Sequence, residues 1–421
     1  MQRLLTVGFN ARSSAWLFAA VSLLALSATT TPAAATTWCV SQNPSASNCQ
    51  PTNQNPNPSF YALPSQVALT AGKPNGLADG DMVIIDPGPN PYVDCSLWNR
   101  NITITANPYM SGQVIIQYDP STNKTNNCYE GTTHAKGIFV IADEGGQHVT
   151  VTVNYIEFEN ADNRLQSGGY DAAGLRISAG ETVYVTHDEF FEDQNGIKAD
   201  DDPGGSGTVS VTNSTFLLNG TCLAGQTACA HGIYAGEINQ LFVDQSYFAG
   251  TGAYPPFASS AAPNVIQSRA QNTGIYRSFI VDGVVNGWPG RSSYLISVNN
   301  GGNVLIERNG MEKGAQSTQP TAIGIATCAV GSNPACGPNC TTNCQPLYNT
   351  TGLGIGSNSF TNDDANSSNI YFVNNYYPTS YSNWSANVCS NTLTNNTAKT
   401  VYGRYQNQTA DYPGFDNMPS C

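Results

Sequence analysis

The sequence predicts an all-β protein: a right-handed parallel β-helix, a solenoid with three short strands per coil, and disulfide-rich ends. Three observations predict it. Strand and turn residues dominate the composition, a spacing of apolar residues recurs every 26 to 32 residues, and twelve cysteines include groups near both ends. Solenoids and propellers are the folds typical of repeats with periods of 20–50 residues.

The composition excludes several classes of protein. Charged residues make up 11% of the 421 residues, against about 25% in ordinary globular domains. The 21 tyrosines argue against disorder, and the scarcity of Lys, Glu and Leu argues against a helical bundle. Asn, Thr, Gly, Val and Ile are the residues of strands and turns.

Residues 1–35 are predicted to be a signal peptide. Arg3 and Arg12 precede an apolar run from Ala15 to Leu26, and Pro-Ala-Ala-Ala at positions 32–35 offers a cleavage site. The run is too short for a membrane span. Removing this segment changes the formal net charge from −13 to −15, because it holds two arginines and no acid. We expect a secreted protein, extracellular or periplasmic.

The repeat consists of a β-forming residue, a second one two positions later, and a large apolar residue five positions after that. Its first members from Val151 to Val304 are separated by 32, 26, 32, 32 and 31 residues. Alternation of inward and outward side chains is the period of a strand, not of a helix. The copies are Ile102/Ile104/Tyr109, Val151/Val153/Phe158, Val183/Val185/Phe190, Val209/Val211/Phe216, Leu241/Val243/Phe248, Thr273/Ile275/Ile280, Val304/Ile306/Met311 and Ile370/Phe372/Tyr377.

A second short apolar pattern precedes most copies, for example Gly174–Ile177, Gly196–Ala199 and Gly232–Ala235. Together the patterns give three short strands per repeat, each expected to pair with its equivalent in the next coil. Phe158, Phe190, Phe216 and Phe248 are then expected to stack in one column of the core. His187, Asn213, Gln245, Arg277, Arg308 and Asn374 are expected to occupy turn positions.

The two ends differ from the middle of the chain. Residues 36–95 are expected to form an N-terminal cap and first coil, residues 96–330 the parallel β-helix, and residues 331–421 a Cys- and Asn-rich region with the last coil. An even number of cysteines in an exported chain indicates disulfides, with no pairing assigned.

A row of polar side chains is the candidate site. If Ile197 and Ala199 point inward, Lys198 and Asp200 point outward, with Arg176 on the previous coil and Tyr234 on the next. Coils lie about 4.8 Å apart. Gln267 and Arg269 continue the row, and Leu295 and Ser297 are expected to project outward after them. An extended sugar chain can therefore follow the solenoid axis.

The pattern resembles the pectin-lyase-like right-handed β-helix superfamily over roughly residues 80–380. Segments such as His231–Gly236, Gln267–Ala270 and Asn300–Gly302 resemble an uncharacterised secreted bacterial β-helix-repeat family. The sequence departs from that family's motifs at four positions, Asn264, Gln267, Leu295 and Ser297, which replace a His, a Lys, a Glu and an Asp.

Lyase-type β-elimination of an acidic polysaccharide is the first predicted function. Lys198, Asp200, Arg269 and His231 are the candidate catalytic residues, and Arg176, Tyr234 and Gln267 the candidate substrate ligands. Elimination needs a cation for the uronate carboxylate and a base for the C5 proton. Arg269 or Lys198 is considered as that base. Asp200, Asp201 and Asp202 are candidate oxygen ligands for Ca²⁺, although Asp also favours turns.

Two alternatives remain. Asp200–Asp201, His231 and Arg269 follow an order similar to that of polygalacturonases, which are inverting hydrolases with two carboxylates. The other alternative is a non-catalytic glycan-binding or structural solenoid. The expected partner is therefore a polysaccharide. The strong negative charge argues against nucleic acid, and no membrane span is predicted. Oligomeric state is left open.

Overall fold

The computed structural model describes residues 35–47, 49, 60–118, 136–143, 146–163, 172–202, 205–220, 229–252, 263–325, 352–365, 367, 369–375, 388–397, 399–406 and 409–413. The chain divides into two units, Met1–Ala34 and Ala35–Cys421, and everything described here belongs to the second. The predicted signal peptide and the four cysteines between positions 328 and 344 lie outside the described residues.

Three long sheets make up the described fold. The first sheet contains, in spatial order, β2 (Phe60–Tyr61), β1 (Thr37–Val40), β3 (Met82–Ile85), β6 (Ile102–Ala106), β9 (Thr150–Asn154), β12 (Thr182–Thr186), β15 (Thr208–Thr212), β18 (Gln240–Asp244), β21 (Asn272–Tyr276), β26 (Asn303–Glu307), β29 (Leu353–Gly356) and β32 (Val388–Cys389).

The second sheet contains β4 (Tyr92–Asp94), β7 (Val114–Tyr118), β10 (Ile156–Glu159), β13 (Glu189–Phe191), β16 (Thr215–Leu217), β19 (Tyr247–Ala249), β22 (Phe279–Val281), β27 (Gly310–Lys313), β30 (Ser359–Asn362) and β33 (Thr392–Asn395). The third contains β5 (Ser96–Trp98), β8 (Gly137–Ile141), β11 (Ala173–Ile177), β14 (Asn195–Ala199), β17 (Ile233–Ala235), β20 (Ile266–Ser268), β25 (Ile296–Val298), β28 (Thr321–Ile325), β31 (Asn369–Asn375), β34 (Thr400–Gln406) and β35 (Thr409–Pro413).

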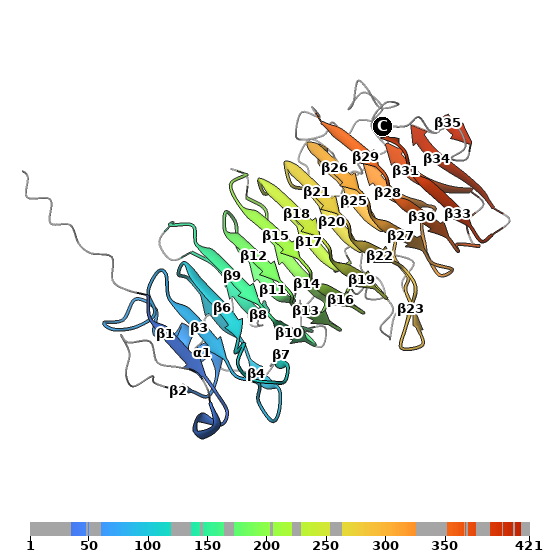
Figure 1. Cartoon of the computed structure of the whole chain (residues 1–421). Helices are drawn as coiled ribbons and strands as arrows, with labels where there is room; N and C mark the ends of the chain where they lie inside the picture. Colours follow the sequence, from blue (N-terminus) through green and yellow to red (C-terminus); the bar gives the residue numbers. More distant parts are fainter. Residues whose placement is uncertain are drawn as a thin grey trace, which may run out of the picture. The chain divides into compact units, whose positions relative to one another are not determined.

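The chain passes through the first, second and third sheets in rotation from β3 to β34, interrupted by the hairpin of β23 (Val284–Val285) and β24 (Trp288–Pro289). We call each such passage a circuit. Each strand pairs in parallel with its equivalents in the neighbouring circuits, and the β34–β35 pair is antiparallel. Figure 1 shows these strands side by side in chain order. The described helices are one α-helix, α1 (Pro64–Ala68), and one 3₁₀ turn (Pro44–Ala46), so the fold is all-β.

The repeated apolar residues form the core. Val183 pairs with Val151 and Val209, and Val185 pairs with Val153 and Val211, on neighbouring strands of the first sheet. All six are buried. The outward neighbours on these strands are Thr, Tyr and Ser, because successive strand residues face opposite sides.

The predicted phenylalanine column is present in the second sheet. The ring centroids of Phe158 and Phe190 are 5.2 Å apart, those of Phe190 and Phe216 4.6 Å, and those of Phe216 and Phe248 4.5 Å. The rings are nearly parallel, within 13°, and buried. In-register parallel strands bring equivalent residues together, so a repeated Phe becomes a continuous stack.

The turn from the first to the second sheet is built the same way in successive circuits. One residue adopts a left-handed backbone, as at Asn213 (φ 50°) and Gln245 (φ 49°). The residue after it accepts a hydrogen bond from the previous circuit: Ser214 N–H donates to Ser246 Oγ at 3.2 Å. His187, Arg277 and Arg308 occupy the same turn position, as predicted, whereas Asn374 lies within β31.

One predicted core position was wrong, and one copy of the repeat was assigned to the wrong sheet. Tyr109 is 74% exposed, and Ile116 fills the inward position by pairing with Phe158. Ile370 and Phe372 belong to the third sheet, not to another copy of the first-sheet pattern, and Tyr377 lies outside the described residues. A period of two identifies an inward residue without identifying its sheet, which explains the error at Ile370 and Phe372.

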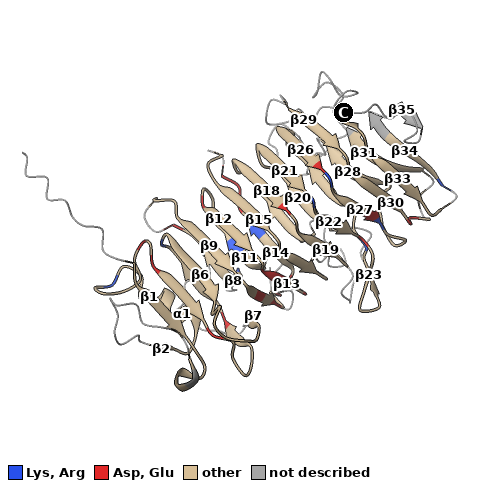
Figure 2. Ribbon diagram, viewed as in Figure 1, with Lys and Arg blue, Asp and Glu red and all other residues tan. Residues whose placement is uncertain are grey.

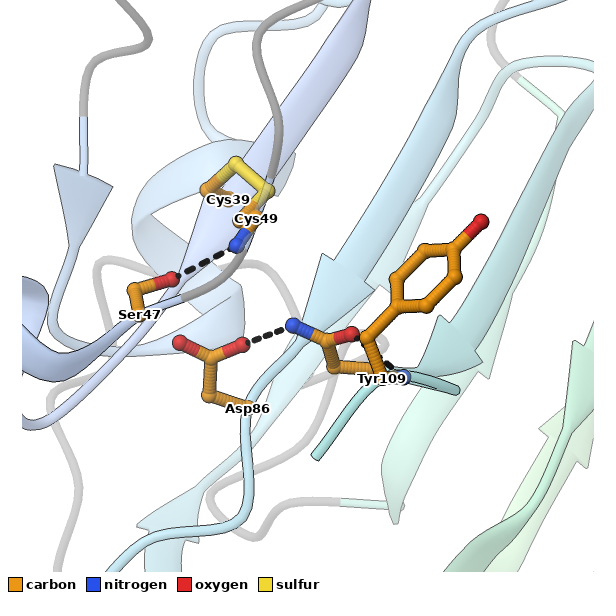
Figure 3. The surroundings of a disulfide bond; sticks show 6 residues. Cys39, Ser47, Cys49, Asp86 and Tyr109 are labelled. Carbon is orange, nitrogen blue, oxygen red and sulfur yellow. Dashed lines mark hydrogen bonds between the residues drawn. A yellow bond between two sulfur atoms is a disulfide. The ribbon is translucent and has the colours of Figure 1, made fainter. Parts of the chain in front are cut away.

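The N-terminal end holds one described disulfide, between Cys39 and Cys49. Figure 3 shows its surroundings: Cys49 N–H donates to Ser47 Oγ at 3.1 Å, while the Tyr109 ring points away from Asp86. Cys39 lies in β1, so this link fastens the first strand of the described chain to the segment that follows it.

Candidate functional site

The predicted polar row lies on the third sheet. Arg176 in β11 pairs with Lys198 in β14, Lys198 with Tyr234 in β17, and Tyr234 with Gln267 in β20. These four residues define the polar row. Asp200 comes directly after β14, and Arg269 directly after β20. Backbone hydrogen bonds from Asp200 N–H to Ile177 O and from Arg269 N–H to Ala235 O continue the pairing of these strands. Parallel register therefore gathers side chains that are far apart in sequence.

The row is less exposed than its outward position predicts. Arg176 and Gln267 are buried, and Arg269 is only 1% exposed. Lys198 and Tyr234 are half-buried. The Gln267 Oε1 atom accepts a hydrogen bond from Asn264 Nδ2 at 2.8 Å. Lys198 and Tyr234 are thus the members of the row best placed to meet a ligand.

Arg176 is paired with Asp200. Arg176 Nη2 lies 2.6 Å from Asp200 Oδ1, and Arg176 Nε donates to Asp200 Oδ2 at 3.0 Å. This two-point contact is the strong geometry for an arginine–carboxylate pair. The guanidinium predicted to meet a uronate is therefore already neutralised by the chain itself.

Arg269 is held even more firmly. Its Nη1 donates to both oxygens of Asp201, at 2.9 and 2.7 Å, and its Nη2 forms an ion pair with Glu237. Nη1 also donates to the Tyr234 hydroxyl at 3.2 Å. Burial alone would lower the pKa of Arg269, but Tyr234, Asp201 and Glu237 outweigh it and the pKa is raised. These partners favour the protonated guanidinium, which argues against Arg269 as the base.

Lys198 and Tyr234 adjoin each other. Lys198 Nζ lies 5.8 Å from the centroid of the Tyr234 ring, within the range of a cation–π contact. Burial raises the pKa of Tyr234, and the charge of Asp201 adds to the rise. Tyr234 is therefore a neutral hydroxyl at neutral pH.

His231 is a buried, neutral ring beside this pair. Its Nδ1 accepts the Asn264 backbone N–H at 3.0 Å, and the backbone N–H of His231 donates to Asn195 Oδ1 at 2.9 Å. Burial, followed by the charge of Lys198, lowers the pKa of His231 to about 3. The ring stacks on Tyr234 with centroids 5.7 Å apart. In this setting His231 positions its neighbours.

The three consecutive aspartates bind different partners. Asp200 binds Arg176 and Asp201 binds Arg269, while Asp202 Oδ2 accepts the Ser206 N–H at 2.7 Å. The Ca²⁺ site stays a prediction. The charged residues around the polar row are three cations and three acids: Arg176, Lys198, Arg269, Asp200, Asp201 and Glu237. Their formal charges cancel. Figure 2 shows the basic residues of β11 and β14 in blue.

Sequence reasoning missed a hollow of about 340 Å³ on the outer face of the first sheet. Phe242, Gly274, Leu305 and Gly354 follow one another there on paired strands. The Tyr276 ring covers Gly274, where an added Cβ would come within 2.8 Å of the ring, and Leu305 covers Gly354 in the same way. Phe242, Tyr276 and Leu305 together form what we call the apolar shelf.

Amide side chains border the apolar shelf. Gln240, Asn272 and Asn303 pair in register on β18, β21 and β26 and form the amide row. Asn303 Nδ2 donates to Asn272 Oδ1 at 2.7 Å, and Asn272 Nδ2 donates to Asn239 O at 3.0 Å. The Phe242 and Tyr276 ring centroids are 5.5 Å apart. Aromatic faces beside fixed amides offer both stacking and hydrogen bonds to a ligand.

The sequence signal for this hollow is weak. Phe242, Gly274 and Leu305 occupy outward positions at successive repeats, but exposed apolar residues on strands are ordinary. Only the register shows that a glycine stands between two large side chains. Among the described residues, no helix is long and apolar enough to cross a membrane.

Comparison with known proteins adds little. No family model matches the chain, and no curated protein matches it. One solved structure, ORF18 of Geobacillus virus E2, aligns at 13% identity with a TM-score of 0.24. The alignment covers 79% of this chain and 55% of that one, so the chain spans about half the length of the viral protein. Superposition this loose supports no statement about fold or function.

Proposed function

We propose that the protein is a secreted polysaccharide-binding protein. The observation that carries this proposal is the hollow on the first sheet, where Phe242 and Tyr276 lie beside the amide row. Sugar rings have apolar faces that stack on aromatic side chains and hydroxyl edges that bond to amides. The hollow crosses the paired strands β18, β21, β26 and β29. The site is therefore elongated across the strands, and a glycan chain would bind along this direction.

The proposed scaffold is a right-handed parallel β-helix with three strands per coil and disulfide-rich ends, similar to the pectin-lyase-like superfamily. The rotation of the chain through three sheets supports it. Cys95, Cys229 and Cys389 also form disulfide bonds, which supports export to an oxidising compartment. N-terminal sequencing of the exported protein should find the mature chain beginning near residue 36.

Retention on polysaccharide gels tests binding directly. The full mature chain is applied to a panel of neutral and uronate polysaccharides, and affinity is measured for the best one. Phe242→Ala and Tyr276→Ala should each weaken binding roughly fivefold to tenfold, because each removes a stacking surface. Phe279→Ala is the matched control, since Phe279 is an exposed aromatic of the second sheet. Equal affinity in all four proteins would remove the hollow as the site.

The second candidate is β-elimination at the polar row, with the half-buried Lys198 beside Tyr234 as the observation in its favour. In that reaction a base takes the C5 proton, the C4–O bond breaks, and a C4–C5 double bond forms. Both terminal nitrogens of Arg269 bind acids, which favours Lys198 as the base, and a bound Ca²⁺ at Asp200–Asp202 would neutralise the uronate.

Product analysis separates the reaction types. Incubation with uronate polymers, with and without Ca²⁺, should raise the ultraviolet absorbance of the unsaturated product if elimination occurs. Lys198→Ala should abolish that signal without changing the melting temperature. Reducing ends without the absorbance would indicate hydrolysis, the third alternative. Neither product, together with retention on the gel, leaves binding as the function.

A further inference from the structure

A separate cluster of ligating side chains lies on two consecutive connections from the third sheet to the first. Asp143 and His148 belong to the connection between β8 and β9, and Glu181 to that between β11 and β12. One ligand atom from each of the three lies within 4.8 Å of the other two. The cluster shares no residue with the polar row or the hollow.

Glu181 supplies the second observation. It is 1% exposed, and its Oε2 accepts the Val149 N–H. Its Oε1 is buried and accepts no hydrogen bond of ordinary geometry from the described residues. An unsatisfied buried carboxylate oxygen is costly, and a cation is the partner that would stabilise it most. Burial also raises the pKa of Glu181, with the charge of Asp143 adding to the rise.

Gly180 makes room for the histidine. Its φ is +87°, a conformation that favours glycine, and an added Cβ would come within 2.1 Å of His148 Cε1. The imidazole therefore occupies the space that any other residue at position 180 would fill. This close approach holds the ring beside Glu181, the next residue along the chain.

We propose that Asp143, His148 and Glu181 form a binding site for a divalent transition metal of the Zn²⁺ type. One imidazole nitrogen and two carboxylate oxygens are a donor set that Zn²⁺ accepts, and three protein ligands leave a position open to water or another ligand. Ca²⁺ prefers six to eight oxygen ligands, so an imidazole in the set favours the transition metal.

Zn²⁺ titration of the metal-free mature chain by calorimetry, with Ca²⁺ as the comparison, tests the proposal. We expect one Zn²⁺ per chain and a rise in melting temperature on binding. His148→Ala and Glu181→Gln should each weaken Zn²⁺ binding at least about tenfold, since even losing a supporting contact to a metal ligand costs 10–100-fold.

Two controls keep the test decisive. His187→Ala removes another exposed histidine and should bind Zn²⁺ like the wild type. His148 is itself exposed, so His148→Ala should melt like the metal-free wild type even if Glu181→Gln is unstable. Absence of saturable Zn²⁺ binding, tighter binding of Ca²⁺, or undiminished Zn²⁺ binding by His148→Ala would each overturn the proposal.

Discussion

Single residues of the candidate site owe their chemistry to partners from other circuits. Arg269 meets Asp201 across 68 positions of sequence and Glu237 across 32. Replacing this buried guanidinium by Ala empties its place in the fold and removes the ion-pair partner of the half-buried Glu237, and both effects are destabilising. Arg269→Ala therefore confounds loss of function with loss of folding, and Lys198 is the better residue to vary.

The buried carboxyl of Glu157 predicts a first pH effect. Burial raises its pKa from 4.5 to about 8, helped by Glu159 and Glu189. Between those values the folded state holds a proton that the unfolded state has released, so wild-type stability falls as pH rises from about 4.5 to about 8. Glu157→Gln removes this loss.

Urea unfolding at pH 5, 6.5 and 8 measures the effect. The stability of Glu157→Gln relative to wild type should increase with pH, by roughly 1–3 kcal/mol in total. A difference that stays constant across the three pH values would contradict the prediction.

His231 predicts the opposite slope. Its pKa in the folded state is about 3, against 6.5 for a solvent-exposed imidazole, with burial as the main cause. Below pH 6.5 the His231 imidazole binds a proton in the unfolded state but stays neutral in the folded state. The contribution of His231 to stability is therefore complete above pH 6.5 and is lost progressively as pH falls toward 3.

The variant His231→Asn should lack this dependence. Between pH 6.5 and 5, wild type should lose roughly 2 kcal/mol more than the variant, as followed by urea unfolding. Parallel curves for the two proteins over this interval would show that the folded ring takes up its proton in the same pH range as the unfolded chain.

Among the structural elements, the phenylalanine stack of the second sheet stabilises several neighbouring circuits at once. Phe216→Ala opens a cavity between Phe190 and Phe248 and should destabilise the protein by roughly 3–5 kcal/mol. Phe279, 60% exposed on the same sheet, is the control, and its replacement by Ala should change stability by about 0.5 kcal/mol or less. Thermal and urea unfolding of both variants check this. Similar losses in the two would contradict a continuous core column.

The asparagine turns are a second shared element. Asn358 Oδ1 accepts the Asn309 N–H at 2.9 Å, and its Nδ2 donates to Ile306 O at 2.9 Å. Asn358→Ala leaves both buried backbone groups without this partner and should cost roughly 2–4 kcal/mol by urea unfolding. The exposed Asn396 is the matched control, and its replacement by Ala should have little effect. A small loss at Asn358 would mean that water replaces the side chain.

At the scale of the whole molecule, the described fold begins with β1. Thr36 N–H donates to Asp81 Oδ1 at 2.7 Å and Trp38 Nε1 to Asp81 Oδ2 at 2.8 Å. Deleting residues 1–34 should leave the melting temperature unchanged. Deleting residues 1–40 removes these bonds and the Cys39–Cys49 link, and should cost at least about 2 kcal/mol. Equal melting of the two truncated proteins would show that β1 contributes nothing.

The sequence was a good guide to the fold because the same spacing recurs. Alternation placed Val183 and Val209 in the core, and repetition placed Phe190 above Phe216. It was a poorer guide where alternation alone had to choose a sheet, as at Ile370, or a register, as at Leu295. Leu295 was expected to project outward and instead lies fully buried in the core.

The alternation and repetition of residues, which the sequence alone displays, determined an all-β fold and the side of each strand that faces the core. Tertiary structure decided which charges meet, how deeply Arg269 is buried, and that Asp143, His148 and Glu181 converge. The physical reason is that a period of two fixes the face of a side chain, whereas its partners depend on the register between circuits and on the packing around it.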